Sequence, residues 1–180
     1  MKKRKTILNS VKLKLVLLWL MFFPFMQTNA VPKIIFDSDI AGVDENGKDR
    51  SDIDDLTALV LLNALADMGK CEILCIVTNT RSDKVVEMID AVNTYYNNPN
   101  VPIGIKGGNS NLIKVTNSYS KIIADNYKHK QKHTNTLSAT EVLRNALSNV
   151  SESDTVIYIH ADVIAYWETL CIGSLFESTP

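Results

Sequence analysis

The sequence has few cysteines and lacks the glycine-containing motifs of serine hydrolases and nucleotide-binding proteins. Only three of its 180 residues are cysteine. Cys71 and Cys75 lie four residues apart in an expected strand, about 13 Å from each other and beyond disulfide reach. Cys171 stands alone, and there is no G-x-S-x-G, P-loop or G-x-G-x-x-G run. We therefore expect no disulfide framework, serine-hydrolase elbow or Gly-rich phosphate loop.

The sequence also lacks an apolar run that would comfortably span a bilayer. The run from Leu15 to Met26 has twelve residues, whereas a membrane helix needs about 20. It follows the basic, acid-free lead-in MKKRKTILNSVKLK and precedes QTNA, where Thr28 and Ala30 have the spacing of a cleavage site. This pattern predicts a signal peptide over residues 1–30, cleaved after Ala30, and an exported (periplasmic or secreted) chain of residues 31–180. An uncleaved membrane anchor is the alternative.

Basic charge is scarce in this mature chain. Six of the 19 Lys and Arg residues lie in the first thirty positions, so 13 remain against 20 Asp and Glu, a net charge of −7. Nucleic acid and anionic membrane surfaces are bound through Lys and Arg. We therefore expect neither as a partner once the signal peptide is removed.

Apolar runs alternate with helical patterns along residues 31–180, as expected for one domain with a real core. The expected strands are Lys33 to Asp37, Cys71 to Asn79, 101–105 and 155–159; the expected helices are Asp52 to Met68, Lys84 to Tyr96, Tyr119 to Tyr127 and Ala139 to Leu147. This rhythm predicts an α/β fold with a mostly parallel open sheet and helices on both faces. An active site is expected at the carboxyl ends of the strands.

The stretch FDSDIAGVDENGKDRSDIDDL, residues 36–56, holds eight carboxylates against two basic side chains. Asp37 and Asp39 end the first strand on one face, and Asp54 and Asp55 begin the next helix, whose dipole favours negative charge. A capping box with Ser51 is the purely structural explanation for Asp54. Converging carboxylates repel one another unless a cation lies between them, and oxygen-only ligands select Ca²⁺ or Mg²⁺ over zinc.

The KIIFDSD strand followed by DDLTAL resembles the D-x-D-x-x-x-D-D signature of the inosine-uridine preferring nucleoside hydrolases. The similarity extends through EILCIVTNT and VNTYYNNPNVPIGIKGG, from about Lys33 to Ile159, and is closest to an exported bacterial branch. The resemblance implies a Rossmann-like α/β fold. It also implies hydrolysis of the N-glycosidic bond of ribonucleosides by a Ca²⁺-activated water, in a family whose members are commonly homo-oligomers.

The resemblance also implies a role for individual residues. Asp39 would be a Ca²⁺ ligand and the catalytic base that activates water, and Asp55 would be a second metal ligand. Asp54 would bind a ribose hydroxyl, and Asn79 would line the ribose pocket; a turn-forming role is the alternative for Asn79. Asp37 would orient these side chains without itself contacting the metal or the ribose.

The chain departs from the family pattern in three places. Fourteen residues separate Asp39 from Asp54 where the family has three, an insertion of eleven. His160 stands where the family has a backbone carbonyl ligand at a glycine-rich turn. The chain ends at Pro180, about half the usual length, so the resemblance covers the amino-terminal half and the expected fold is truncated. A frameshift near His160 would explain the loss of pattern.

Two other functions compete with hydrolysis. A non-catalytic metal- or sugar-binding remnant would keep the acidic residues without turnover. The IIFDSD run also resembles the first strand of haloacid-dehalogenase-type phosphatases, although Ala41 stands where that family has Thr or Val. His129 and His133 have the spacing of a helical metal pair, but the adjacent lysines favour a solvated basic face.

Overall fold

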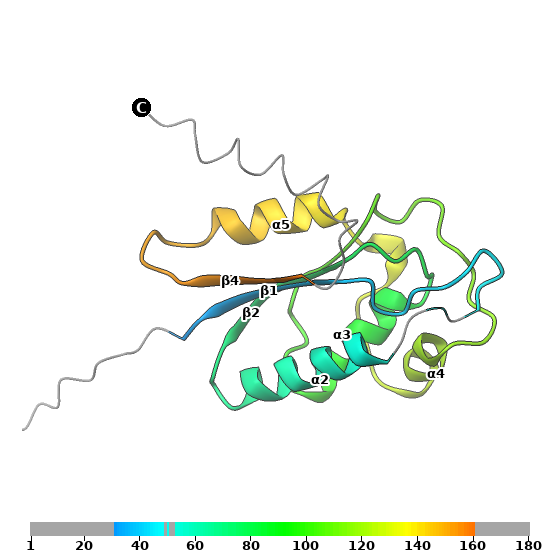
Figure 1. The fold of residues 1–180 in the computed structure, drawn as a ribbon, viewed down its shortest axis with the longest axis horizontal. Helices are drawn as coiled ribbons and strands as arrows, with labels where there is room; N and C mark the ends of the chain where they lie inside the picture. The colour runs from blue at the N-terminus through cyan, green and yellow to red at the C-terminus, as the bar shows by residue number, and fades with distance from the viewer. Residues whose placement is uncertain (1–30, 49, 51–52, 161–180) are drawn as a thin grey trace, which may run out of the picture.

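The computed structural model describes residues 31–48, 50 and 53–160 (Figure 1). The elements in chain order are β1 (Lys33–Ser38), α2 (Asp54–Asp67), β2 (Glu72–Thr78), α3 (Val85–Tyr95), β3 (Ile103–Ile105), α4 (Tyr119–Asn126), the 3₁₀ helix η1 (His133–Asn135), α5 (Ala139–Ser148) and β4 (Val156–His160). The expected strands and helices are confirmed, each with its ends within two residues. The expected signal peptide, Cys171 and the tail after His160 lie outside the described residues.

The four strands form one parallel sheet in the order β3-β2-β1-β4. Helices cover both of its faces, with α5 on one side and α2 and α3 on the other (Figure 1). The α/β prediction is confirmed, because near-continuous apolar strands must be buried on both faces. Within the described ranges, no helix has the length and apolar character needed to cross a membrane.

Side chains alternate between two apolar cores along β1. Ile34 and Phe36 pack into the larger core with α2 and α3, whereas Ile35 packs with Cys75 and Val77 against α5. The strand β4 is different, because its three central residues remain 39–43% exposed. The sheet therefore has a well-covered centre and a thinly covered side at β4.

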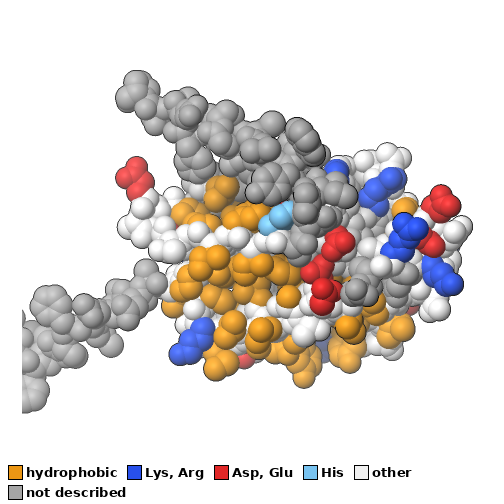
Figure 2. All heavy atoms as spheres, viewed as in Figure 1, with side chains coloured by type: hydrophobic (Ala, Val, Ile, Leu, Met, Phe, Trp, Pro, Cys, Tyr) orange, Lys and Arg blue, Asp and Glu red, His pale blue; other side chains and the backbone are white. Residues whose placement is uncertain are grey.

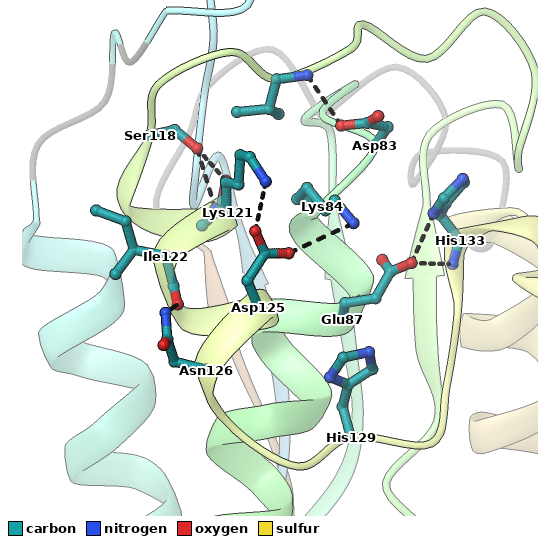
Figure 3. A network of polar contacts seen from close by, with 12 residues as sticks. Asp83, Lys84, Glu87, Ser118, Lys121, Ile122, Asp125, Asn126, His129 and His133 are labelled. Atoms are coloured by element: carbon teal, nitrogen blue, oxygen red, sulfur yellow. Dashed lines mark hydrogen bonds and ion pairs between the residues drawn. The ribbon is translucent and has the colours of Figure 1, made fainter.

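The segment between α4 and α5 lies against polar residues of α3 (Figure 3). His133 Nδ1 lies 2.7 Å from Oε1 of Glu87, a side chain only 5% exposed, and His129 Nδ1 lies 3.1 Å from the Tyr127 carbonyl. Residues 127–132 are not helical, so the idea of a helical His129–His133 metal pair is wrong. The lysines of this stretch are exposed, as expected of a solvated face, and His133 is half-buried where it meets Glu87.

Asp90, one turn further along α3, anchors the same segment. It is fully buried, and its Oδ2 accepts hydrogen bonds from the backbone N–H groups of Lys130 (2.6 Å) and Gln131 (2.9 Å). The Gln131 side-chain amide donates both to Asp90 Oδ1 and to the Val101 carbonyl. One carboxylate thus ties the segment to α3 and to the start of β3.

Replacing Asp90 should therefore destabilise the fold. Asp90→Ala removes the acceptor of the Lys130 and Gln131 backbone N–H groups and should lower the free energy of unfolding by about 2 kcal/mol. Urea denaturation followed by circular dichroism would measure this. The matched control is Asp125→Ala, which removes an exposed carboxylate paired with Lys121 on α4 and should cost about 0.5 kcal/mol or less. Equal losses in the two variants would contradict the anchoring role of Asp90.

Candidate active site

The strands β1 and β2 end in two turns of the same design, residues 38–40 and 78–80. In each, the hydroxyl of the first residue accepts a hydrogen bond from the backbone N–H of the third, at 3.3 Å after β1 and 3.1 Å after β2. The first residues of the two turns are partners in the parallel register. The middle residues, Asp39 and Asn79, therefore leave the sheet at the same level on neighbouring strands.

A direct hydrogen bond fixes one turn to the other. The Thr80 hydroxyl donates to the backbone carbonyl of Asp39 at 2.9 Å, and Thr80 is 5% exposed. Asp39 and Asn79 are both half-buried. The structure thus brings together the expected base and the expected ribose-pocket residue, and it holds their backbones in a defined arrangement.

The chain after Asp39 is anchored to α4. Ala41 is buried and has a φ of 58°, in the left-handed region that costs a non-glycine residue about 1 kcal/mol or more. Its N–H donates to the hydroxyl of Tyr119 at 2.7 Å. This contact offsets part of the strain and directs the chain away from the sheet.

The inserted residues form a closed loop. The Arg50 N–H donates to the Gly42 carbonyl at 2.9 Å, so the loop returns to the place where it left. Inside it, Asp44 Oδ1 accepts from the N–H groups of Asn46 and Lys48. The backbone hydrogen bond from Lys48 is the main cause that lowers the pKa of Asp44 below its usual value.

This loop packs against residues 114–117. The Thr116 N–H donates to the Gly47 carbonyl at 3.1 Å. Gly47 has a φ of 74°, and a Cβ there would lie 2.1 Å from the Lys114 carbonyl oxygen, so only glycine fits. Asp49, Ser51 and Asp52 lie outside the described residues. The described part of the insertion is therefore folded away onto a neighbouring segment.

The two acids at the start of α2 stand at its first two positions. Asp54 is exposed and Asp55 is 8% exposed. The N-cap is Ile53, which makes no side-chain cap hydrogen bond. Ser51, the residue expected to form a capping box with Asp54, lies outside the described residues. The free N–H groups and dipole of this helix end favour both carboxylates. Figure 2 shows acidic side chains gathered between the strand ends and the start of α2, with a histidine nearby.

Asp37 makes contacts that the sequence did not reveal. It is 4% exposed, its Oδ2 accepts from the Tyr158 hydroxyl at 2.5 Å, and His160 Nδ1 lies 3.1 Å from the same oxygen. His160 is its partner in the β1–β4 register. Asp37 thus fixes the end of β4 beside the end of β1. The paired turns, in contrast, had a signal in the sequence: at the ends of both β1 and β2, a Ser or Thr is followed directly by an Asp or Asn.

Asp39 and Asp55, the two expected metal ligands, both carry carboxylate oxygens, the ligand type that hard cations such as Ca²⁺ prefer. Ca²⁺ takes six to eight oxygens. Among residues 31–48, 50 and 53–160, no group of three or more His, Cys, Asp or Glu side chains is placed to hold a metal.

The hydrogen bond between the two turns gives a direct stability test. Thr80→Val removes the donor to the Asp39 carbonyl and should lower the free energy of unfolding by about 1–2 kcal/mol. Thr80→Ser keeps the hydroxyl and should lose less. Thermal and urea unfolding of the two variants would compare them. The coupling between the turns would be refuted if Ser proved as destabilising as Val.

Cys75 lies under this site and should be chemically inert. Burial, together with the negative charge of Asp37, raises the pKa of its thiol to about 12. The folded protein therefore holds this proton more tightly than the unfolded chain, and thiolate forms only well above neutral pH. At pH 8, iodoacetamide should modify the half-buried Cys71 first and Cys75 only after unfolding, as peptide mass mapping would show. Equal rates in the folded protein would contradict this.

No protein-family model matches the chain, and no curated protein matches it.

Proposed function

We propose that this chain follows the plan of a Ca²⁺-dependent nucleoside N-ribohydrolase and binds a riboside at the carboxyl edge of its sheet. The observation that carries the proposal is the pair of linked turns that place Asp39 and Asn79 side by side. A solvated acidic loop would not need a buried hydroxyl to fix its backbone. The insertion also supports the proposal. Because the loop closes on itself, its two ends lie together, and Asp39 is not separated from α2 by the full length of the inserted residues.

Each acidic residue has a task in this reaction. Asp39 accepts the proton of the attacking water, and Asp39 and Asp55 are the residues that would hold Ca²⁺. When bound, such an ion lowers the pKa of water so that hydroxide is available near neutral pH. Asp54 and Asn79 hold ribose hydroxyls and orient the sugar for attack.

Negative charge at this edge favours the bond cleavage itself. Loss of the base from a ribonucleoside develops positive charge on the sugar, as in glycoside hydrolysis. Carboxylates already held near the sugar stabilise that charge without reorganising. Asp37 is a positioning residue, because its bonds to Tyr158 and His160 hold the end of β4 in place.

A non-catalytic riboside- or metal-binding protein is the second candidate. It is favoured by one observation: in the part of the chain that the structure describes, no three or more His, Cys, Asp or Glu side chains are grouped so that they could hold a metal. In that case the same edge would bind ligand, but no base would be released. Turnover separates the two functions.

The proposal is tested by titrating residues 31–180 with Ca²⁺ in a calorimeter and by assaying ribose release from inosine and uridine. Asp39→Ala should raise the Kd for Ca²⁺ at least about tenfold, since it removes a charged ligand. It should also abolish ribose release. Asp125→Ala, an exposed carboxylate on α4, is the control and should change neither. Ca²⁺ binding without ribose release would favour the second candidate, and wild-type protein that binds no Ca²⁺ would refute the proposed metal site.

A further inference from the structure

A third polar residue stands beside the two linked turns. The strands β1, β2 and β3 end at the same level, because their last residues are partners in the parallel register. Each of the three strands is followed directly by a polar residue: Asp39, Asn79 and Lys106, in that order across the sheet. The Lys106 N–H donates to the Thr78 carbonyl at 2.8 Å, so Lys106 is fixed beside the turn that carries Asn79. The edge thus offers an acid, an amide and an amine on three neighbouring strands.

Lys106 differs from the other half-buried lysines of the described ranges. Lys33, Lys84 and Lys121 are each paired with a carboxylate. Within residues 31–48, 50 and 53–160, the Lys106 side chain makes neither an ion pair nor a hydrogen bond, although it too is half-buried. An ammonium group is strongly hydrated, and removing part of its water is unfavourable unless an anion offsets the loss. A ligand with an anionic group would supply that partner.

The turn after Lys106 leaves room for such a group. Gly107 and Gly108 have φ values of 71° and 68°, and the Gly108 N–H closes the turn by donating to the Ile105 carbonyl at 3.0 Å. A Cβ at Gly107 would have the Ser110 hydroxyl, at 3.9 Å, as its nearest contact outside the adjoining residues. The backbone beside Lys106 is therefore bare and uncrowded, as is common where a backbone lies close to a ligand.

We propose that the riboside bound at this edge is a ribonucleoside 5′-monophosphate, with its phosphate on Lys106. This inference rests on the proposed function, in which the ribose is held by its adjacent hydroxyls at C2′ and C3′. A phosphate on either of these oxygens would remove the hydrogen that the hydroxyl donates. The oxygen at C5′ is the remaining place for an anionic group.

The order of charges across the three strands suits this molecule. Positive charge develops on the ribose as the base leaves, whereas the phosphate is negative. Asp39 lies at one end of the row and Lys106 at the other, with the neutral Asn79 between them. Neighbouring strands are about 4.8 Å apart, so the two charged residues are about 10 Å apart at the backbone, and the flexible lysine side chain can cover part of that distance. Each charge of the ligand would thus meet its opposite.

The phosphate takes no part in the bond cleavage. The C1′–N bond breaks and the oxygen of the attacking water joins C1′. Asp39 takes one proton of that water, and the base takes up one proton from the solvent. The products are ribose 5-phosphate and the free base. Because the phosphate ester stays intact, no inorganic phosphate is released, unlike in a reaction of the haloacid-dehalogenase type.

Calorimetric titration of the purified protein with ribose 5-phosphate and with ribose, in the presence of Ca²⁺, tests the inference, because neither sugar has a base to lose. Wild type should bind ribose 5-phosphate at least about tenfold more tightly than ribose, since one charged contact is added. Lys106→Met should remove this preference, whereas Lys106→Arg keeps the positive charge and should retain most of it. Circular dichroism would check that both variants are folded.

The matched control is Lys70→Met. Lys70 is exposed and lies two residues before the start of β2, at the amino edge of the sheet, so its replacement should leave the preference unchanged. Equal affinity of the wild type for the two sugars would overturn the inference, and so would a preference that survives Lys106→Met. Inorganic phosphate that binds as tightly as ribose 5-phosphate would overturn it as well, because the sugar would then contribute nothing.

Release of base from inosine and from inosine 5′-monophosphate is assayed separately, so that the two proposals can fail independently. A preference for ribose 5-phosphate that depends on Lys106, without release of base from either compound, would refute the proposed hydrolysis and support the inference. Release of base from inosine by a protein that shows no such preference would refute the inference alone.

Discussion

The parallel register of β1 with its two neighbours is the constraint on which the rest of this structure depends. β1 lies between β2 and β4, with Ser38 opposite Thr78 and Asp37 opposite His160. The first pairing sets the two turns side by side, and the second brings a histidine to a buried carboxylate. A shift of one residue would turn every side chain to the opposite face. The pairing with β2 has one such irregularity, between Ile34 and Ile35. Beyond it, Phe36 in the larger core and Ile35 in the smaller one hold the register up to the strand end.

The sequence was sufficient to predict the strands, the helices and the α/β class, because apolar periodicity reports burial directly. It was also sufficient to bring Asp39 and Asn79 to one edge, since parallel strands end together. It was insufficient where tertiary contacts decide the local conformation. The closed loop at Gly47 depends on the approach of residues 114–117.

The polar residues of α3 are buried, although their spacing alone does not reveal it. Glu87, Asp90 and Asn93 recur every three residues, a spacing that resembles a solvent-facing stripe. All three are at least 96% buried, and the segment before α5 covers Glu87 and Asp90 with hydrogen bonds. Periodicity indicates which residues share a face of a helix. It does not indicate whether water or another segment of the chain meets that face.

The two matching turns have a consequence for the chemistry that this edge can perform. They offer two side-chain positions of equivalent backbone geometry, filled by residues of nearly the same shape, an acid and its amide. Two carboxylates there would repel each other, and one would tend to stay protonated. Asp39 only accepts hydrogen bonds when ionised, while Asn79 can both donate and accept. A molecule with two adjacent hydroxyl groups would therefore be held in one orientation, because one hydroxyl must donate to Asp39 whereas the other can accept from the Asn79 amide nitrogen. The two turns already fix the backbone on both sides of such a molecule.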